Sequence, residues 1–98
     1  MKLARVVGTT VATQKDPKLG ARKLMVLNTL KIDGTPTDDF LVAVDTVGAG
    51  IGEVVLYVTG SSARMTELTR DSPVDAAIVA IVEEVEVEGK TLYRKAGV

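Results

Sequence analysis

The sequence predicts an all-β fold: a small closed antiparallel β-barrel of five to six strands with one short helix. Val, Ile and Thr are concentrated in several short apolar runs, and such runs favour strands. Gly, Pro and Asp separate the runs and indicate turns. A chain of 98 residues forms one domain, residues 1–98, and closing a small sheet into a barrel removes its exposed edges.

The first half of the chain divides into strands and turns. Gly8 lies within the first apolar run and predicts a bulge or a sharp bend. Residues 14–22 are polar and contain Pro17 and Gly20, which indicates a loop. Residues 33–39 are expected to form a turn that begins with Asp33-Gly34, a strong hairpin signal. The expected strands span residues 2–13, 23–30, 40–45 and 53–59.

The second half contains the predicted helix. Ser61 or Ser62 can cap the start of a helix of about two turns, which residues 70–73 then end. Residues 74–88 are rich in Val and Ile and are interpreted as one long strand, and residues 91–95 as a short final strand. A short helix placed late among five or six strands is typical of an OB-like barrel.

The long segment 74–88 is apolar on both faces for half its length. Because strand side chains alternate, one face carries odd-numbered residues, which we expect to face the barrel core, and the other even-numbered residues. With 46% hydrophobic residues and a mean hydropathy of +0.23, the chain has more apolar surface than a small barrel can hide. Self-association is therefore predicted. The odd-numbered set is Ala77, Val79, Ile81, Val85 and Val87, and the even-numbered set is Ile78, Ala80 and Val82.

Composition excludes several classes of function. A net charge of −1 exerts no long-range attraction on nucleic acid or on an anionic membrane. The chain has neither Cys nor His, which removes the thiolate and the usual general base and metal ligand. No run approaches the roughly 18 apolar residues of a membrane span, and the first residues do not resemble a leader peptide. We expect a cytoplasmic protein without catalytic, cofactor or metal-binding residues.

The glycine-rich stretch "GAGIGE", residues 48–53, is open to three interpretations. A phosphate-binding loop is disfavoured, because its glycine spacing differs and a strand rather than a helix follows. The others are a connection between strands and a meeting point of several copies, where only small residues fit. Asp45 and Glu53 flank the stretch: we expect Asp45 to accept backbone N–H groups of the loop, whereas Glu53 could face a central axis.

Two rival functions stay open on the residues alone. A nucleic-acid-binding OB module would need a basic groove and stacking aromatics, but Phe40 and Tyr57 are expected to be packed. An enzyme could use Asp45 and Glu53 as an acid–base pair, or a serine of "GSSAR" as nucleophile, although no histidine supports it. A basic cluster is either a solvated loop or an edge that docks on an acidic partner; it comprises Lys15, Lys18, Arg22 and Lys23.

Three blocks covering most of residues 2–87 resemble the vertex proteins of bacterial microcompartments, of the EutN/CcmL type: "VVGTTVATQKDPKLGARKLMVL", "VAVDTVGAGIGEVVLYVTGSSAR" and "PVDAAIVAIVEEVEV". The resemblance implies a non-enzymatic shell subunit with an OB-like barrel. It further implies homopentamers that close the vertices of a polyhedral shell built from hexameric proteins. By resemblance, the residues near the five-fold axis and its pore are Asp45, Gly48, Ala49, Gly50, Ile51, Gly52 and Glu53.

Overall fold

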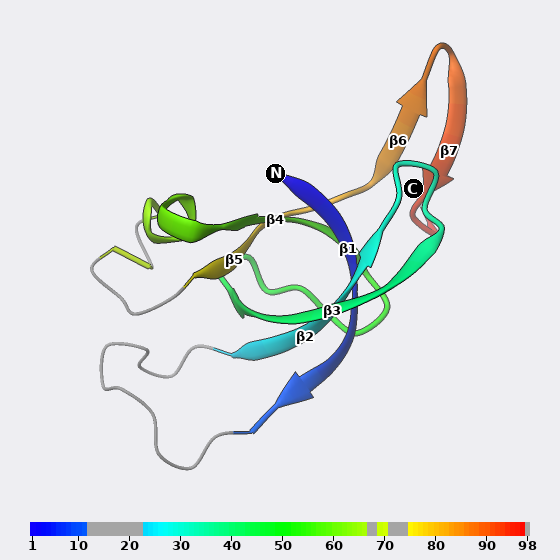
Figure 1. The fold of residues 1–98 in the computed structure, drawn as a ribbon. Helices are drawn as coiled ribbons and strands as arrows, with labels where there is room; N and C mark the ends of the chain where they lie inside the picture. The colour runs from blue at the N-terminus through cyan, green and yellow to red at the C-terminus, as the bar shows by residue number, and fades with distance from the viewer. Residues whose placement is uncertain (12–22, 67–68, 71–74, 98) are drawn as a thin grey trace.

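The computed structural model describes residues 1–11, 23–66, 69–70 and 75–97. Nearly all regular structure in these ranges is β-strand, as the sequence predicts (Figure 1). The elements are β1 (Lys2–Thr10), β2 (Leu24–Leu30), β3 (Pro36–Asp45), β4 (Val54–Thr59), the short 3₁₀ helix η2 (Gly60–Arg64), β5 (Ala76–Ile81), β6 (Glu84–Val87) and β7 (Lys90–Arg94).

Five strands close into a barrel in the order β1-β2-β3-β5-β4, with β4 pairing back to β1. All neighbours are antiparallel except β3 and β5, which pair in parallel over a short register that includes Val44 and Ala77. The predicted closed and mostly antiparallel barrel is therefore confirmed. Closure gives each of the five strands a partner on both sides, with β3 and β5 joined only through Val44–Ala77 and Asp45–Ile78.

Register shifts interrupt the pairing of the barrel strands at three places, one of them between β2 and β3 at residues 37–39. In β1 the register passes from Val6 opposite Leu27 to Gly8 opposite Val26, so Val7 is an extra residue. This confirms the bend that Gly8 predicts. In β5 the register against β4 shifts around Val79. An extra residue moves the following side chains to the opposite face, because strand side chains alternate with period two.

The bulge at Val79 corrects the predicted core face of β5. The even-numbered Ile78 is fully buried in the main core cluster, and Ile81 packs against the same cluster only after the bulge has shifted the alternation. The odd-numbered Ala77 belongs to a second cluster, with Ala63 of η2. The expectation that all odd-numbered residues face the main core is therefore wrong.

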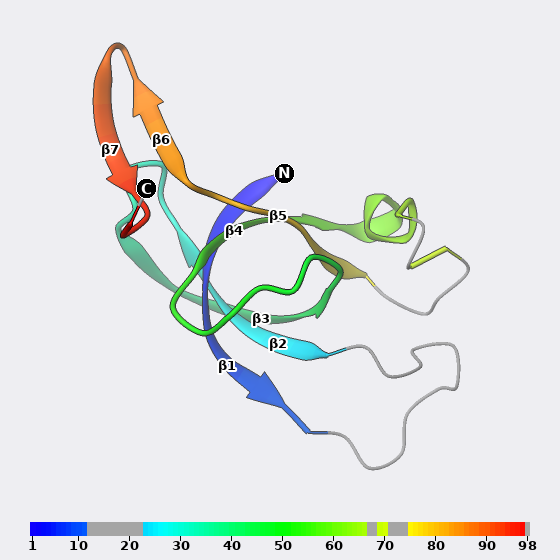
Figure 2. The same ribbon diagram turned by 180° about the vertical axis from the view of Figure 1, so that it is seen from behind.

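The predicted strand over residues 74–88 is two strands. β5 ends at Ile81, and the chain leaves the barrel through Val82 and Glu83 before β6 begins. β6 and β7 form a separate two-stranded sheet that projects from the barrel (Figures 1 and 2). Val85 and Tyr93 hold the base of this hairpin by packing on a small cluster around Leu3.

The helix is shorter than predicted. It is one 3₁₀ segment that starts at Gly60, so Ser61 and Ser62 lie inside it rather than at its cap. Thr59 occupies the capping position and makes no side-chain capping hydrogen bond. The predicted turn begins at Asp33-Gly34 as expected, and Thr35 N–H donates to the Asp33 carboxylate at 2.9 Å. The prediction that it extends to residue 39 is wrong, because β3 begins at Pro36. The predicted loop 14–22 lies outside the described residues.

The two aromatic residues expected to be packed differ in their burial. Tyr57 of β4 is buried in the main core cluster. Phe40 is 63% exposed, so the expectation for this residue is wrong. Phe40 lies on the outer face of β3, because side chains alternate along the strand and the residues that pack in the core are Leu41 and Ala43.

We expect Leu27→Ala to lower the free energy of unfolding by about 2–5 kcal/mol, because it opens a cavity in the barrel core. Leu27 is fully buried in the main cluster. Urea denaturation at a fixed protein concentration measures the change. Ile32→Ala, in the exposed β2–β3 turn, is the control and should change stability by less than about 0.5 kcal/mol. Equal losses would contradict this description of the core.

Candidate functional site

The loop between β3 and β4, residues 46–53 and here called the glycine loop, closes one end of the barrel (Figure 2). Ala49 is buried in the main core cluster. Gly52 N–H donates to the Val6 carbonyl at 2.7 Å, and Val6 N–H donates to the Glu53 carbonyl at 2.9 Å. These bonds continue the pairing of β4 with β1, so the loop is part of the barrel.

Asp45 fixes the start of the glycine loop. Its Oδ1 accepts the N–H groups of Val47 at 3.0 Å and Gly48 at 3.1 Å. The Asp45 N–H donates to the Lys23 carbonyl at 3.0 Å, which ties this residue to the segment before β2. The predicted role of Asp45, a carboxylate that accepts backbone N–H groups of the loop, is confirmed.

Glu53 fixes the other end of the loop. Its Oε1 accepts the Gly50 N–H at 2.6 Å, and its Oε2 accepts from Lys95 Nζ at 2.6 Å. The Lys95 ammonium, and after it the Gly50 N–H, hold the pKa of the Glu53 carboxyl below its usual value. The same pair raises the pKa of Lys95. Sequence reasoning missed Lys95, because nothing local relates a residue beyond β7 to this loop.

Contacts and backbone conformation within the chain explain why the loop contains glycine at three positions. Gly48 has φ +76° and Gly52 has φ +90°, which favour glycine. At Gly50 an added Cβ would lie 3.3 Å from Glu53 Oε1, so a side chain would disturb the carboxylate. Ile51 is different, since its side chain is 61% exposed. Ile51 is therefore the most exposed of the large apolar side chains of the loop, ahead of Val47.

Hydrogen bonds within the chain already occupy the carboxylates of this site. A general base works best with a pKa near the operating pH, whereas the pKa of Glu53 is shifted away from neutrality. Asp45 Oδ1 and both Glu53 oxygens already accept hydrogen bonds from the loop or from Lys95. Across the described ranges, no three His, Cys, Asp or Glu side chains gather as a metal site would require.

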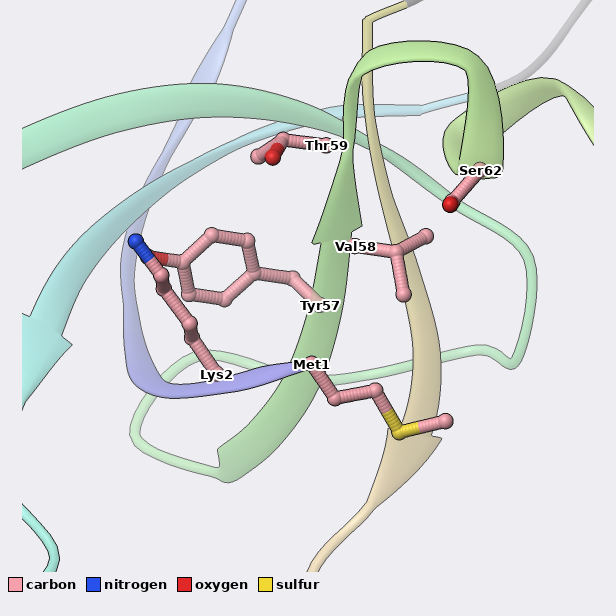
Figure 3. A pocket seen from close by; sticks show the side chains of 6 residues that line it. All are labelled: Met1, Lys2, Tyr57, Val58, Thr59 and Ser62. Atoms are coloured by element: carbon pink, nitrogen blue, oxygen red, sulfur yellow. The ribbon is translucent and has the colours of Figure 1, made fainter.

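Two hollows lie beside the start of β1, and Met1, Lys2 and Tyr57 line both. One measures about 330 Å³ and is also lined by Leu30, Ile32 and Asp39, among others. The other measures about 210 Å³ and includes Ser62 (Figure 3). In the part of the chain that is described, no hydrogen bond joins Ser62 to Lys2. Burial, and to a lesser extent Asp39, raises the pKa of Tyr57.

Of the four residues of the basic cluster, the structure describes Lys23. Lys15, Lys18 and Arg22 lie outside the described residues. Lys23 is exposed and precedes β2. Its carbonyl accepts the Asp45 N–H, so it lies close to the start of the glycine loop. No helix among the residues with an assigned structure is long and apolar enough to cross a membrane.

We predict that Glu53→Gln destabilises the protein at neutral pH and that the difference from wild type disappears in acid. The lowered pKa of Glu53 contributes stability that is present above the unfolded-state pKa of about 4.3. That contribution is lost as the pH falls through the lower pKa of the folded state. Thermal unfolding from pH 7 to pH 3 measures the difference. Glu86→Gln, on exposed β6, is the control, and a pH-independent difference for Glu53→Gln would contradict the ion pair.

Several known proteins are similar to this chain in both sequence and fold. Residues 1–83 match the family model described as "Ethanolamine utilisation protein EutN/carboxysome". The carboxysome shell vertex protein CcmL of Synechococcus elongatus is 42% identical over 95 residues, covering 97% of this chain and 96% of that protein. The structure of Gloeobacter violaceus CcmL superposes with a TM-score of 0.92 at 39% identity, covering 97% of this chain and 98% of that chain.

A further relative is described as a pentameric shell protein. The GrpN pentameric microcompartment shell protein from Rhodospirillum rubrum superposes with a TM-score of 0.81 at 45% identity, covering 89% of this chain and 99% of that chain. The similarity extends over nearly the whole of each relative and includes the glycine loop and its flanking strands. The chain belongs to the EutN/CcmL family of microcompartment shell vertex proteins.

Proposed function

We propose that this protein is a structural subunit of a bacterial microcompartment shell and forms homopentamers that cap the shell vertices. The observation that carries the proposal is the similarity to a pentameric shell protein at 45% identity, over 89% of this chain. The described residues also include exposed large hydrophobic side chains, among them Ile51 and Phe40, which supports association between copies.

The mechanism of such a subunit is geometric. A surface on one copy that binds a different surface on the next copy generates a closed ring when the rotation fits. A flat sheet of hexagonal units cannot close, and a pentagonal unit introduces the curvature that closure needs. The partners are therefore other copies of this chain and the hexameric shell proteins around each vertex. The assembled shell is expected in the cytoplasm.

In this proposal the glycine loop lies near the five-fold axis. The rigidity of the loop supports this placement. Asp45 fixes one end of the loop, Glu53 fixes the other, and Ala49 packs in the core between them. A loop held in this way presents Ile51 in a constant position. A ring needs such a constant position, because any variation in one copy is repeated five times around the axis.

The alternative of a nucleic-acid-binding module has no specific observation in its favour. Phe40 is exposed and could in principle stack on a base. Asp38 and Asp39 precede it directly, and two carboxylates beside a stacking platform would repel phosphates.

Native mass spectrometry of the purified chain tests the pentamer. We expect the mass of five 10.3 kDa chains. Co-expression with hexameric shell proteins tests the vertex role: closed polyhedral shells should form with the chain present, and open sheets or tubes without it. A stable monomer, or closed shells without this chain, would contradict the proposal.

The basic cluster is proposed as the contact with neighbouring hexamers, through Lys15, Lys18, Arg22 and Lys23. Replacing all four residues with Glu should leave the pentamer intact but reduce its incorporation into shells, because the substitution inverts the charge of the contact. Quantitative gel analysis of purified shells measures incorporation. Lys31→Glu, an exposed lysine of the β2–β3 turn, is the control. Unchanged incorporation of the fourfold variant would show that the contact lies elsewhere.

A further inference from the structure

The outer faces of β1, β2 and β3 carry apolar side chains that no part of the described chain covers. Val42 of β3 pairs directly with Val26 of β2, which pairs in turn with Gly8 of β1. Phe40 lies two residues before Val42 and therefore on the same face. Phe40 is highly exposed and Val42 is 46% exposed. These residues form a row across the sheet on the side away from the barrel core.

Gly8 contributes to this row by lacking a side chain. Its φ is not in the left-handed region, so the backbone does not require glycine there. A Cβ at this position would lie 3.8 Å from Val26 Cβ, an ordinary van der Waals contact. The chain itself therefore gives no reason for glycine at position 8. The missing side chain leaves Val26 uncovered and makes the surface flat enough for another backbone or side chain to approach.

The row continues into the glycine loop. Val7, the extra residue of the β1 bulge, is 43% exposed and follows Val6, whose carbonyl accepts the Gly52 N–H. The Arg5 guanidinium donates to the Gly52 carbonyl at 2.6 Å. These two bonds place Ile51 beside β1. The resulting surface is here called the apolar strip and comprises Ile51, Val7, Val26, Val42 and Phe40.

We propose that the apolar strip is one half of the contact between adjacent subunits in the ring, and that a second copy of this chain covers it. The inference rests on the proposed pentamer and adds the surface that makes it. The cores of protein interfaces concentrate aromatic and aliphatic side chains such as these.

Two observations favour a second copy over another partner. The Arg5 side chain beside the strip is charged, and its guanidinium is already held within the chain by the Gly52 carbonyl, so the strip residues offer a partner only apolar contact. It is also continuous with the glycine loop, the segment proposed to lie near the axis where copies meet. Because a five-membered ring is built from unlike surfaces, the strip contacts a different surface of the neighbouring copy rather than the neighbour's own strip.

Phe40→Lys tests the proposal. Phe40 is exposed and Asp38 and Asp39 are adjacent in sequence, so the substitution should not prevent folding of the subunit. Within the ring it would replace an apolar side chain by a charged ammonium at each of the five contacts. We expect the concentration at which the ring dissociates to rise at least tenfold, by the usual effect of removing an aromatic interface residue of about this size. Sedimentation velocity over a dilution series measures this concentration.

Two further variants complete the test. Ile32→Lys is the matched control, because Ile32 is 60% exposed but lies in the β2–β3 turn, outside the strip; it should keep the wild-type ring. Gly8→Ala should leave the circular dichroism of the subunit unchanged and weaken the ring, because its methyl group fills the flat region above Val26.

The outcomes separate this inference from the proposed function. If wild type is a pentamer and Phe40→Lys dissociates to a folded monomer while Ile32→Lys does not, the strip is the contact. If Phe40→Lys keeps the wild-type dissociation concentration, or Ile32→Lys dissociates equally, the inference is wrong and the pentamer stands. A wild-type chain that stays monomeric at high concentration overturns both. A wild-type dimer that Phe40→Lys dissociates would keep the strip and reject the vertex role.

Discussion

The closure of five strands into a narrow barrel is the constraint on which the rest of the structure depends. The interior accepts one face of each strand, and it is filled by small and medium side chains such as Ala4, Val6, Leu27, Val55 and Ile78. A chain with 46% hydrophobic residues cannot place all of them inside. Closure therefore divides the apolar residues into a set that the chain buries by itself and a set that it leaves on the outside, where only other molecules can cover it.

A second constraint links distant parts of the chain through one carboxylate. Glu53 bonds the glycine loop through Gly50 N–H and the segment beyond β7 through Lys95. The family match ends at residue 83, so the partner of Glu53 lies outside the matched region. The hairpin β6–β7 thus does more than extend from the barrel. After β7 the chain returns to the barrel, where Lys95 bonds Glu53 and so helps to fix the glycine loop.

Sequence reasoning identified the features that depend on local chemistry. The strands near residues 2–10, 24–30 and 54–59, the bend at Gly8, the Asp33-Gly34 turn and the acceptor role of Asp45 each follow from a few adjacent residues, and each is present. The barrel topology followed from the number and order of the strands, together with the cost of open edges.

The features that sequence reasoning missed depend on register or on long-range contact. Val79 looks like any other residue of an apolar run, and only its pairing with β4 reveals the bulge that reverses the faces. Glu83 and Glu84 gave no clear signal that the chain leaves the barrel between two strands. The exposure of Phe40 depends on which face of β3 the barrel uses, and the contact of Lys95 with Glu53 joins residues 42 positions apart.

The glycines illustrate the difference between a residue that its own chain requires and one that it does not. In the loop, the small residues first suggested a crowded meeting point of copies, yet backbone conformation explains Gly48 and Gly52, and the Glu53 carboxylate explains Gly50. Gly8 suggested only a bend, yet neither its φ nor its neighbours require the absence of a side chain. A glycine that its own chain does not need is the stronger indication of an external contact. By that reasoning, the proposed contact between copies extends from Ile51 across the outside of β1, β2 and β3, rather than being confined to the loop.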